Sequence, residues 1–180
     1  MRRALKIHPD SHCDAATQIA VEITRPRPNN LLLRYIVTGK IDDLILPPIT
    51  ASARSDDELW QHTCFEAFFR SGQTYYEFNF APSTQWAVYH FDDYRTGKRA
   101  ANEIGAPRID VTSRKAVYEL LVSLVLPELP DDAAWRLGLS AVIEESGDRK
   151  SYWALAHPPG KADFHHSDCF ALELPAVERL

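Results

Sequence analysis

The sequence lacks several features that mark whole classes of protein. It has one methionine and three cysteines among 180 residues, and this number of thiols is both low and odd for a disulfide framework. No stretch reaches the roughly 18 to 20 apolar residues that a membrane-spanning helix needs. The formal net charge is -5, whereas a nucleic-acid partner or an anionic membrane surface would require a basic face. Neither kind of partner is therefore expected.

A secretory signal pattern is also missing. The basic start at Arg2 and Arg3 is not followed by the apolar run of a signal peptide. Cys13, Cys64 and Cys169 stand in dissimilar surroundings, and a buried small apolar side chain is the commonest role for such a residue. We therefore expect a cytoplasmic protein with reduced, mostly buried thiols.

The composition is that of a chain that can build its own core. Hydrophobic residues make up 45% of the 180 residues, which suffices for a core without disulfides or a structural metal. The length fits one domain and leaves little room for a second. We expect a single domain spanning residues 1–180.

The pattern of apolar residues is that of strands. Period-two alternation runs along much of the chain, whereas helical periodicity is scarce. The runs 19–24 and 31–38 are separated by a segment rich in proline and asparagine, which predicts a hairpin. Roughly ten short runs of this kind, with turn residues between them, are typical of a sandwich or barrel. Because no convincing crossover helix joins two strands, the prediction is an all-β fold, a two-sheet antiparallel β-sandwich.

The stretch 63–91 holds the highest concentration of aromatic residues, in three predicted strands at 63–70, 74–80 and 86–91. The gap 71–73 contains Gly72 and predicts a three-residue hairpin loop between the first two. Alternate residues of a strand share a face, so each of these strands presents two different sides. We expect a packing side made of Tyr76, Phe78, Phe80, Tyr89 and Phe91, and a mixed side made of Glu77, Asn79 and Trp86.

The mixed side has two interpretations. The ordinary one is the solvated face that antiparallel sheets commonly present. The functional one is a ligand surface, on which Trp86 or Trp153 stacks against a flat ligand. Glu66, Glu77 and Asn79 would then form hydrogen bonds to the hydroxyl groups of that ligand. The residues alone leave both interpretations open.

A second cluster lies near the C-terminus and offers an alternative function. Its side chains could in principle bind zinc or another divalent ion, which would make the chain a metal-dependent enzyme or a metal-binding protein. Their spacing matches no established metal signature, and the two adjacent histidines would point apart in an extended chain. The other interpretation is that the loop forms hydrogen bonds to the sheet edge or contacts the ligand. The cluster comprises His157, Asp163, His165 and His166.

No catalytic constellation stands out in the sequence. It has no glycine-rich phosphate loop, nucleophile elbow or zinc-protease helix, so we expect no catalytic residue and no cofactor. Glu66 and Glu77 could form a carboxylate pair of the glycosidase kind, but the sequence does not give their separation. A binding protein is favoured over an enzyme. Edge strands and aromatic patches are compatible with either a monomer or a homodimer.

Several segments together resemble a known family. They contain the strings LWQHTCFEAF, YEFNFAPS, WAVY and YWAL, and they look like DOMON-like proteins related to family-nine carbohydrate-binding modules. The resemblance covers roughly residues 31–174, and extended motifs of this length are more specific than a three-residue pattern. The segments are 59–68, 76–83, 86–89, 94–95, 152–155, 157–158, 161, 163–166 and 169–170.

The resemblance implies a β-sandwich of immunoglobulin-like or jelly-roll type that binds a small ligand without catalysis. The implied ligand is a carbohydrate or a similar polyhydroxylated compound. In the carbohydrate-binding relatives two aromatic side chains clamp a sugar, and motif position assigns this clamp to Trp86 and Trp153. Trp60 is expected to be a packing residue where a strand begins.

The polar partners of the ligand follow from the same motif segments. Glu66, Glu77 and Asn79 are expected to hold the hydroxyl groups of the sugar. Arg95 and His165 complete the expected ligand-binding set, and no metal ligand is included in it.

Overall fold

The computed structural model describes residues 1–55, 58–126 and 134–176. It contains strands and three short 3₁₀ turns, and the described residues include no α-helix. The 3₁₀ turns are η1 (Ile41–Asp43), η2 (Leu59–Gln61) and η3 (Ser167–Cys169). The strands are β1 (Arg2–Ile7), β2 (Ala16–Arg27), β3 (Asn30–Gly39), β4 (Cys64–Ser71), β5 (Thr74–Phe80), β6 (Trp86–Phe91), β7 (Arg99–Ala100), β8 (Arg108–Arg114), β9 (Val117–Val125), β10 (Trp135–Glu145), β11 (Arg149–Ala154) and β12 (Leu172–Leu174).

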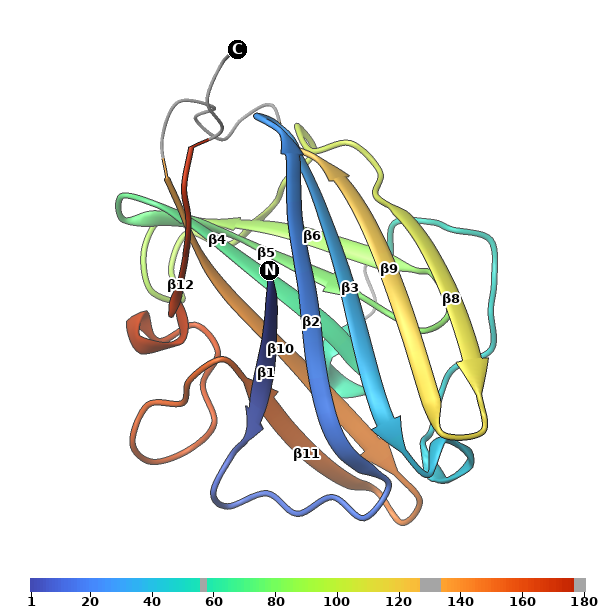
Figure 1. The fold of residues 1–180 in the computed structure, drawn as a ribbon. Helices are drawn as coiled ribbons and strands as arrows, with labels where there is room; N and C mark the ends of the chain where they lie inside the picture. Colours follow the sequence, from blue (N-terminus) through green and yellow to red (C-terminus); the bar gives the residue numbers. More distant parts are fainter. Residues whose placement is uncertain (56–57, 127–133, 177–180) are drawn as a thin grey trace.

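The strands form one hydrogen-bonded path in the order β7-β6-β5-β4-β10-β11-β1-β2-β3-β9-β8, with β12 paired to β10. Strand β1 joins two halves of this path, because its residues 2–5 pair with β2 and its residues 6–7 pair with β11. The first half, β1-β2-β3-β9-β8, lies across the second half, β7-β6-β5-β4-β10-β11 (Figure 1). All pairings between these strands are antiparallel.

The prediction of an all-β antiparallel fold is confirmed. The expectation of two separate sheets is not, because the ladder continues through β1 and the sheet curls back over itself. The physical reason is that one strand changes its partner halfway along its length. Periodicity along a strand carries no information on which strand lies beside it.

The core lies between the two halves. The ring of Phe65 on β4 lies 5.1 Å from that of Tyr35 on β3 and 6.0 Å from that of Tyr118 on β9. The hydroxyl of Tyr35 donates a 2.7 Å hydrogen bond to the backbone carbonyl of Glu66. This bond satisfies a buried hydroxyl and connects the two halves directly.

The predicted hairpins are present in the structure. Strands β2 and β3 pair from Ala16 opposite Gly39 to Arg27 opposite Asn30. Strands β4 and β5 are joined at Gly72, whose φ of 66° lies in the left-handed region that glycine tolerates. The expected three-residue loop is shorter than predicted, because Ser71 pairs with Thr74.

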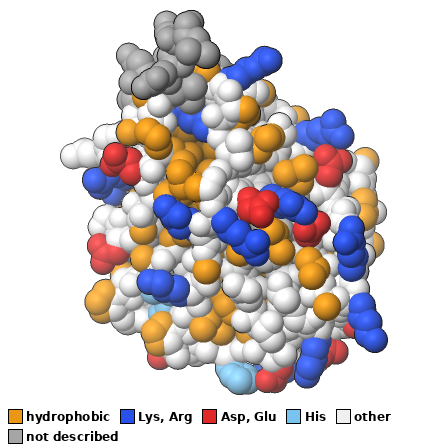
Figure 2. Space-filling model, in the orientation of Figure 1, with side chains coloured by type: hydrophobic (Ala, Val, Ile, Leu, Met, Phe, Trp, Pro, Cys, Tyr) orange, Lys and Arg blue, Asp and Glu red, His pale blue; other side chains and the backbone are white. Residues whose placement is uncertain are grey.

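The outward face of the first half is an ordinary solvated sheet surface. Arg34 on β3 forms ion pairs with Glu22 at 3.3 Å and Glu119 at 2.6 Å. Figure 2 shows basic and acidic side chains interspersed over this side of the molecule. Within the described ranges, no helix is long and apolar enough to cross a membrane.

The second half is buried on both of its faces around β4, β5 and β6. The register places Tyr75 opposite Phe91 and Glu77 opposite Tyr89, so Tyr89 and Phe91 share the face of Glu77. Their assignment to the packing side was therefore wrong. A separate aromatic cluster lies on the face that Glu77 shares. It consists of Phe68, Tyr75, Phe91 and Phe170.

Candidate ligand-binding site

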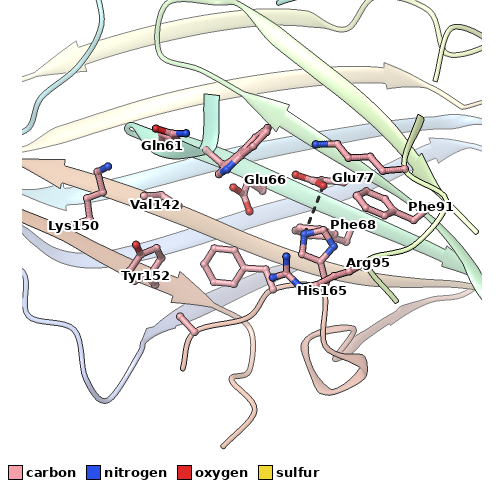
Figure 3. Close-up of a pocket in the computed structure, with 14 residues that line it drawn as sticks. Gln61, Glu66, Phe68, Glu77, Phe91, Arg95, Val142, Lys150, Tyr152 and His165 are labelled. Carbon is pink, nitrogen blue, oxygen red and sulfur yellow. Dashed lines mark ion pairs between the residues drawn. The ribbon is translucent and has the colours of Figure 1, made fainter. Parts of the chain in front are cut away.

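A pocket of about 530 Å³ opens on the face of β4, β5 and β10 that points away from the core (Figure 3). This volume lies within the usual range for small-molecule sites. The sheet supplies the floor, and three segments supply the walls: η2, the loop after β6 and the loop after β11. The lining residues are Trp60, Gln61, Glu66, Phe68, Glu77, Phe91, Arg95, Lys98, Val142, Lys150, Tyr152, Ala162, Phe164 and His165.

Two buried glutamates lie in the floor. Glu66 is 2% exposed and Glu77 is 5% exposed. The hydroxyl of Ser140 donates to Oε2 of Glu66 at 3.0 Å, and the amide of Asn79 donates to Oε1 of Glu77 at 2.8 Å. Glu66 lies opposite Asn79 in the β4–β5 ladder, so Glu77 is its diagonal neighbour on the same face.

The environment of Glu66 favours its neutral form. Burial, and then the nearby charge of Glu77, raise the pKa of Glu66 to about 8. Burial also raises the pKa of Glu77, although the hydrogen bond from Asn79 opposes the shift. Among the described side chains, no Lys, Arg or His forms an ion pair with Glu66. These surroundings favour the protonated form of Glu66.

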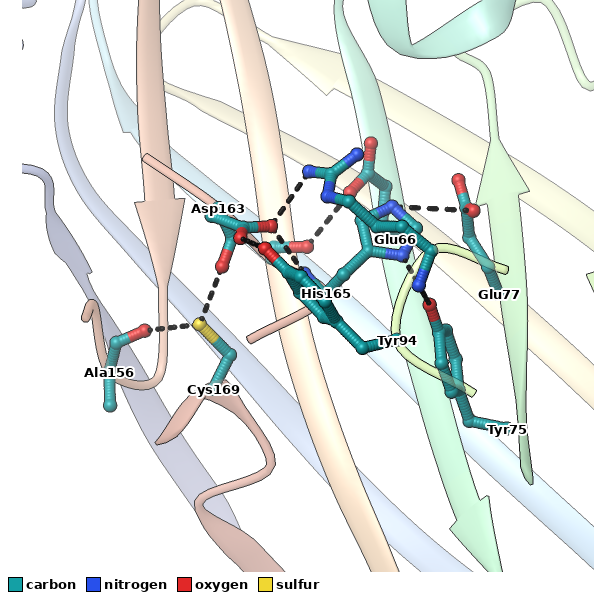
Figure 4. A network of polar contacts seen from close by, with 10 residues as sticks. Glu66, Tyr75, Glu77, Tyr94, Ala156, Asp163, His165 and Cys169 are labelled. Atoms are coloured by element: carbon teal, nitrogen blue, oxygen red, sulfur yellow. Dashed lines mark hydrogen bonds and ion pairs between the residues drawn. The ribbon is translucent and has the colours of Figure 1, made fainter. Parts of the chain in front are cut away.

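A polar network connects the two loops that form one wall of the pocket (Figure 4). Nη2 of Arg95 lies 2.7 Å from Oδ1 of Asp163, and the hydroxyl of Tyr94 donates to Oδ2 of the same carboxylate. The backbone N–H of His165 donates to Oδ1 of Asp163 at 3.1 Å. Asp163 thereby connects the loop after β6 to the loop after β11. The charge-assisted bond to Arg95 is of the stronger kind.

The ring of His165 lies between this network and the floor. Its Nδ1 lies 2.8 Å from the hydroxyl of Tyr75, which also accepts a hydrogen bond from the backbone N–H of Arg95. With the Tyr75 hydroxyl as the donor to Nδ1, the proton of the neutral ring lies on Nε2; the opposite tautomer would make Nδ1 the donor to Tyr75. That Nε2 lies 3.7 Å from Oε2 of Glu77.

His165 is expected to stay neutral over the physiological pH range. Burial, and then the charge of Arg95, lower the pKa of His165 to about 4. In an NMR titration its ring resonances should be constant from pH 5.5 to 8 and should shift only near pH 4. A midpoint close to the ordinary value of 6.5 would show that the imidazole is not held in this pocket wall.

Aromatic side chains line two sides of the pocket. On one side Trp60 lines the pocket, and the ring of Tyr89 lies 6.1 Å from the Trp60 ring. Nζ of Lys98 lies 4.5 Å from the centre of the Trp60 ring and 3.9 Å from that of the Tyr89 ring. On the other side the rings of Tyr152 and Phe164 lie 6.2 Å apart. Partly exposed rings of this kind can pack against the apolar face of a flat ligand.

The structure brings together four of the residues that the sequence proposed for ligand binding, namely Glu66, Glu77, Arg95 and His165. Asn79 is fully buried and holds Glu77 from the side. It therefore positions a floor carboxyl.

The two tryptophans proposed as a clamp lie elsewhere. Trp86 and Trp153 are each 5% exposed and belong to the main core. Trp86 pairs with Phe80, and Trp153 pairs with Ala141, so both point away from the pocket. The indole nitrogen of Trp153 donates to the hydroxyl of Ser151 at 3.0 Å. The sheet lies between these rings and the pocket.

The aromatic residues that do reach the pocket were not selected from the sequence. Trp60, Tyr152 and Phe164 line it, whereas Trp60 was expected only to pack. Tyr152 is the neighbour of Trp153, and successive residues of a strand face opposite sides. Placing Trp153 in the core would have identified Tyr152 as the residue that faces the pocket.

The C-terminal histidines and Asp163 do not assemble a metal centre. His157 lies 2.8 Å from the backbone carbonyl of Lys6 through its Nε2, and His166 accepts a hydrogen bond from the backbone of Asp168. In the part of the chain that the structure describes, no three His, Cys, Asp or Glu side chains come together as metal ligands. Hydrogen bonding of the loop to the rest of the molecule, the other interpretation, is what the structure shows.

These features define an all-β protein with a small-molecule-sized pocket on the outer face of its sheet. Its fold is shared with solved carbohydrate-binding structures. A candidate carbohydrate-binding protein from Bacteroides uniformis matches with a TM-score of 0.66 and 12% identity, over 94% of this chain and 83% of that chain.

Two structures of a family-nine carbohydrate-binding module from Caldicellulosiruptor kristjanssonii match as well. The complex with cellotriose has a TM-score of 0.53 and 11% identity, over 89% of this chain and 74% of that chain. The complex with glucose has a TM-score of 0.54 and 12% identity, over 95% of this chain and 81% of that chain. No family model matches the sequence, and no curated protein matches it. At these identities the likeness establishes the fold.

Proposed function

We propose that the chain is a non-catalytic binding module whose pocket takes a carbohydrate or a similar polyhydroxylated compound. The observation that carries the proposal is a pocket of about 530 Å³ with buried carboxyl groups in its floor and aromatic rings in its walls. The fold neighbours support it, because two of them are complexes with cellotriose and glucose.

The chemistry of the lining suits a sugar. A sugar hydroxyl both donates and accepts hydrogen bonds, and the floor offers Glu66 and Glu77 for this purpose, each already oriented by a neighbouring side chain. The C–H faces of a sugar ring are apolar and can pack against Trp60 or Tyr152. The pocket therefore combines the two kinds of contact that a saccharide needs.

We also propose that the module is DOMON-like and that it acts in the cytoplasm. The motif segments support the relationship, and the three free cysteines, two of them buried, are compatible with a reducing compartment. The packing of the two halves across one core supports a sandwich class of immunoglobulin-like or jelly-roll type. Monomer and homodimer are both compatible with the proposal, and light scattering at several concentrations would distinguish them.

Changing Trp60 to alanine is expected to weaken saccharide binding by about ten-fold, as a lost aromatic contact of roughly 1.5 kcal/mol implies. Isothermal titration calorimetry with glucose and cellotriose would measure this. Leu121→Ala is the matched control, because Leu121 is 39% exposed and lies on β9 in the other half of the sheet.

The control variant should bind as the unmodified protein does. Equal loss in both variants would mean that binding does not occur in this pocket. If neither probe nor any member of a glycan array binds the unmodified protein, the proposed function is wrong.

A further inference from the structure

Among the described residues, Glu66 differs from the other carboxyl groups around the pocket in having no nitrogen-donor side chain beside it. Asp163 has Arg95 at 2.7 Å, and Glu77 has the amide of Asn79 and the imidazole of His165 beside it. In the described ranges, the carboxyl group of Glu66 has a single side-chain donor, the hydroxyl of Ser140. Its carboxyl group points into the pocket (Figure 3).

The surroundings of Glu66 disfavour a negative charge on nearly every side. Cys64, on the same strand, is fully buried, and burial raises the pKa of its thiol well above the ordinary value. Tyr35, behind the sheet, has a hydroxyl whose pKa burial also raises. Glu77 adds a second carboxyl from β5, and Ser140 on β10 is uncharged.

The positive groups around the pocket are all directed elsewhere. Arg95 is paired with Asp163, and Nζ of Lys98 lies over the rings of Tyr89 and Trp60. Lys150 lines the pocket from β11 and is not within ion-pair distance of Glu66. His165, the remaining side chain of the lining that can take a positive charge, faces Glu77.

We infer that Glu66 meets the ligand as a neutral carboxylic acid that donates a hydrogen bond to a ligand oxygen, so that the pocket selects an uncharged saccharide over one that carries an ammonium group. The inference rests on the proposed function and specifies the ligand class for the same pocket. One carboxyl oxygen accepts from Ser140, and the protonated group then offers its O–H to the ligand.

The discrimination against an ammonium group has a simple electrostatic origin. A neutral acid has no charge to offset the desolvation of a cation. The charge of Arg95 is offset by Asp163, but Lys98 and Lys150 together outweigh the single carboxylate charge of Glu77 in the lining and repel a positive ligand as well. The raised pKa of Glu66, about 8, agrees with the geometry. A buried carboxyl that stays protonated and acts as a donor at neutral pH has precedent in enzyme sites.

The test is calorimetric titration of the full chain with glucose and with glucosamine between pH 6 and 9.5. We expect glucose affinity to be constant at low pH and to fall above about pH 8, approaching ten-fold per pH unit as one proton must be taken up on binding. At pH 6 glucosamine, which is then an ammonium ion, should bind at least ten-fold more weakly than glucose.

Two variants separate this role from a merely structural one. Glu66→Gln keeps a hydrogen-bond donor in place. Its affinity for glucose at pH 6 should be within a few-fold of that of the unmodified protein, and this affinity should not decrease at higher pH. The pKa of Glu66 is raised by burial and then by the charge of Glu77. Glu77→Gln removes that charge, so the decrease in glucose affinity should begin at a lower pH. An infrared titration of the unmodified protein, which follows the band of the protonated carboxyl, needs no variant and no ligand.

The possible outcomes are distinct. Any of three results overturns the inference and leaves the proposed saccharide function standing. These are a glucose affinity that does not depend on pH, tighter binding of glucosamine than of glucose at pH 6, and an ionised Glu66 at pH 6. Failure of every saccharide probe at every pH overturns the proposed function itself, and the inference fails with it.

Discussion

Replacing Trp86 with alanine is expected to lower the free energy of unfolding by about 3 to 5 kcal/mol, the usual cost of removing a large buried aromatic side chain. Trp86 is 5% exposed and belongs to the main core. The guanidinium of Arg54 also lies 4.4 Å from its ring centre. The variant loses both the packing and this cation–π contact.

Urea denaturation followed by circular dichroism would measure the loss. Trp60→Ala is the informative comparison, because Trp60 is only partly buried on η2 and lines the pocket. It should lower binding while changing the free energy of unfolding much less. If Trp86→Ala were as stable as the unmodified protein and had lost ligand binding, Trp86 would be a ligand contact and the pocket described above would be the wrong site.

Between about pH 4.5 and pH 8, Glu66 is expected to lower the free energy of unfolding progressively as pH rises. The unfolded chain releases this proton near the ordinary pKa of 4.5, while the folded protein retains it to about 8. The folded state therefore binds more protons in this window, and its stability decreases with pH. At about 1.4 kcal/mol per pH unit, the full effect is on the order of 4 to 5 kcal/mol.

The total pH profile also contains a contribution of opposite sign from His165. Its folded pKa is lowered to about 4 from 6.5, so the unfolded state binds more protons between these values. Stability through His165 therefore rises with pH. The effect of Glu66 must be read as the difference between the unmodified protein and Glu66→Gln.

That difference is measurable by urea denaturation at a series of pH values. Relative to the unmodified protein, Glu66→Gln should become progressively more stable from pH 5 to about pH 8, and the difference should level off above that. A difference that is constant over this range would mean that Glu66 ionises in the folded protein at its ordinary pKa.

The positions of the strands could be predicted from the sequence, because they depend on residues close together in the chain. Period-two alternation and turn residues located the β2–β3 and β4–β5 hairpins. Within each strand, alternation also grouped residues correctly, as with Tyr76, Phe78 and Phe80. These predictions need only the chain on either side of each residue.

The sequence did not predict which face of one strand lies on the same side of the sheet as a given face of its neighbour. Alternation in β6 separates Trp86 from Tyr89 but does not say which of the two shares a face with Glu77. The β5–β6 register decides this by placing Glu77 opposite Tyr89 and Phe80 opposite Trp86. A shift of β6 by one residue would move every one of its side chains to the opposite face of the sheet. The residues of the turn before β6 do not predict which register is adopted.

The sequence by itself thus determined an antiparallel all-β chain. Its motif segments also predicted Glu66, Glu77, Arg95 and His165 as ligand-binding residues, and the structure places all four in the lining of one pocket. Tertiary structure alone decided the rest. The register placed Trp153 in the core, left Tyr152 facing the pocket, and let two distant loops meet at Asp163. The physical reason is that local periodicity sets the two sides of each strand, whereas only long-range pairing decides which side becomes core.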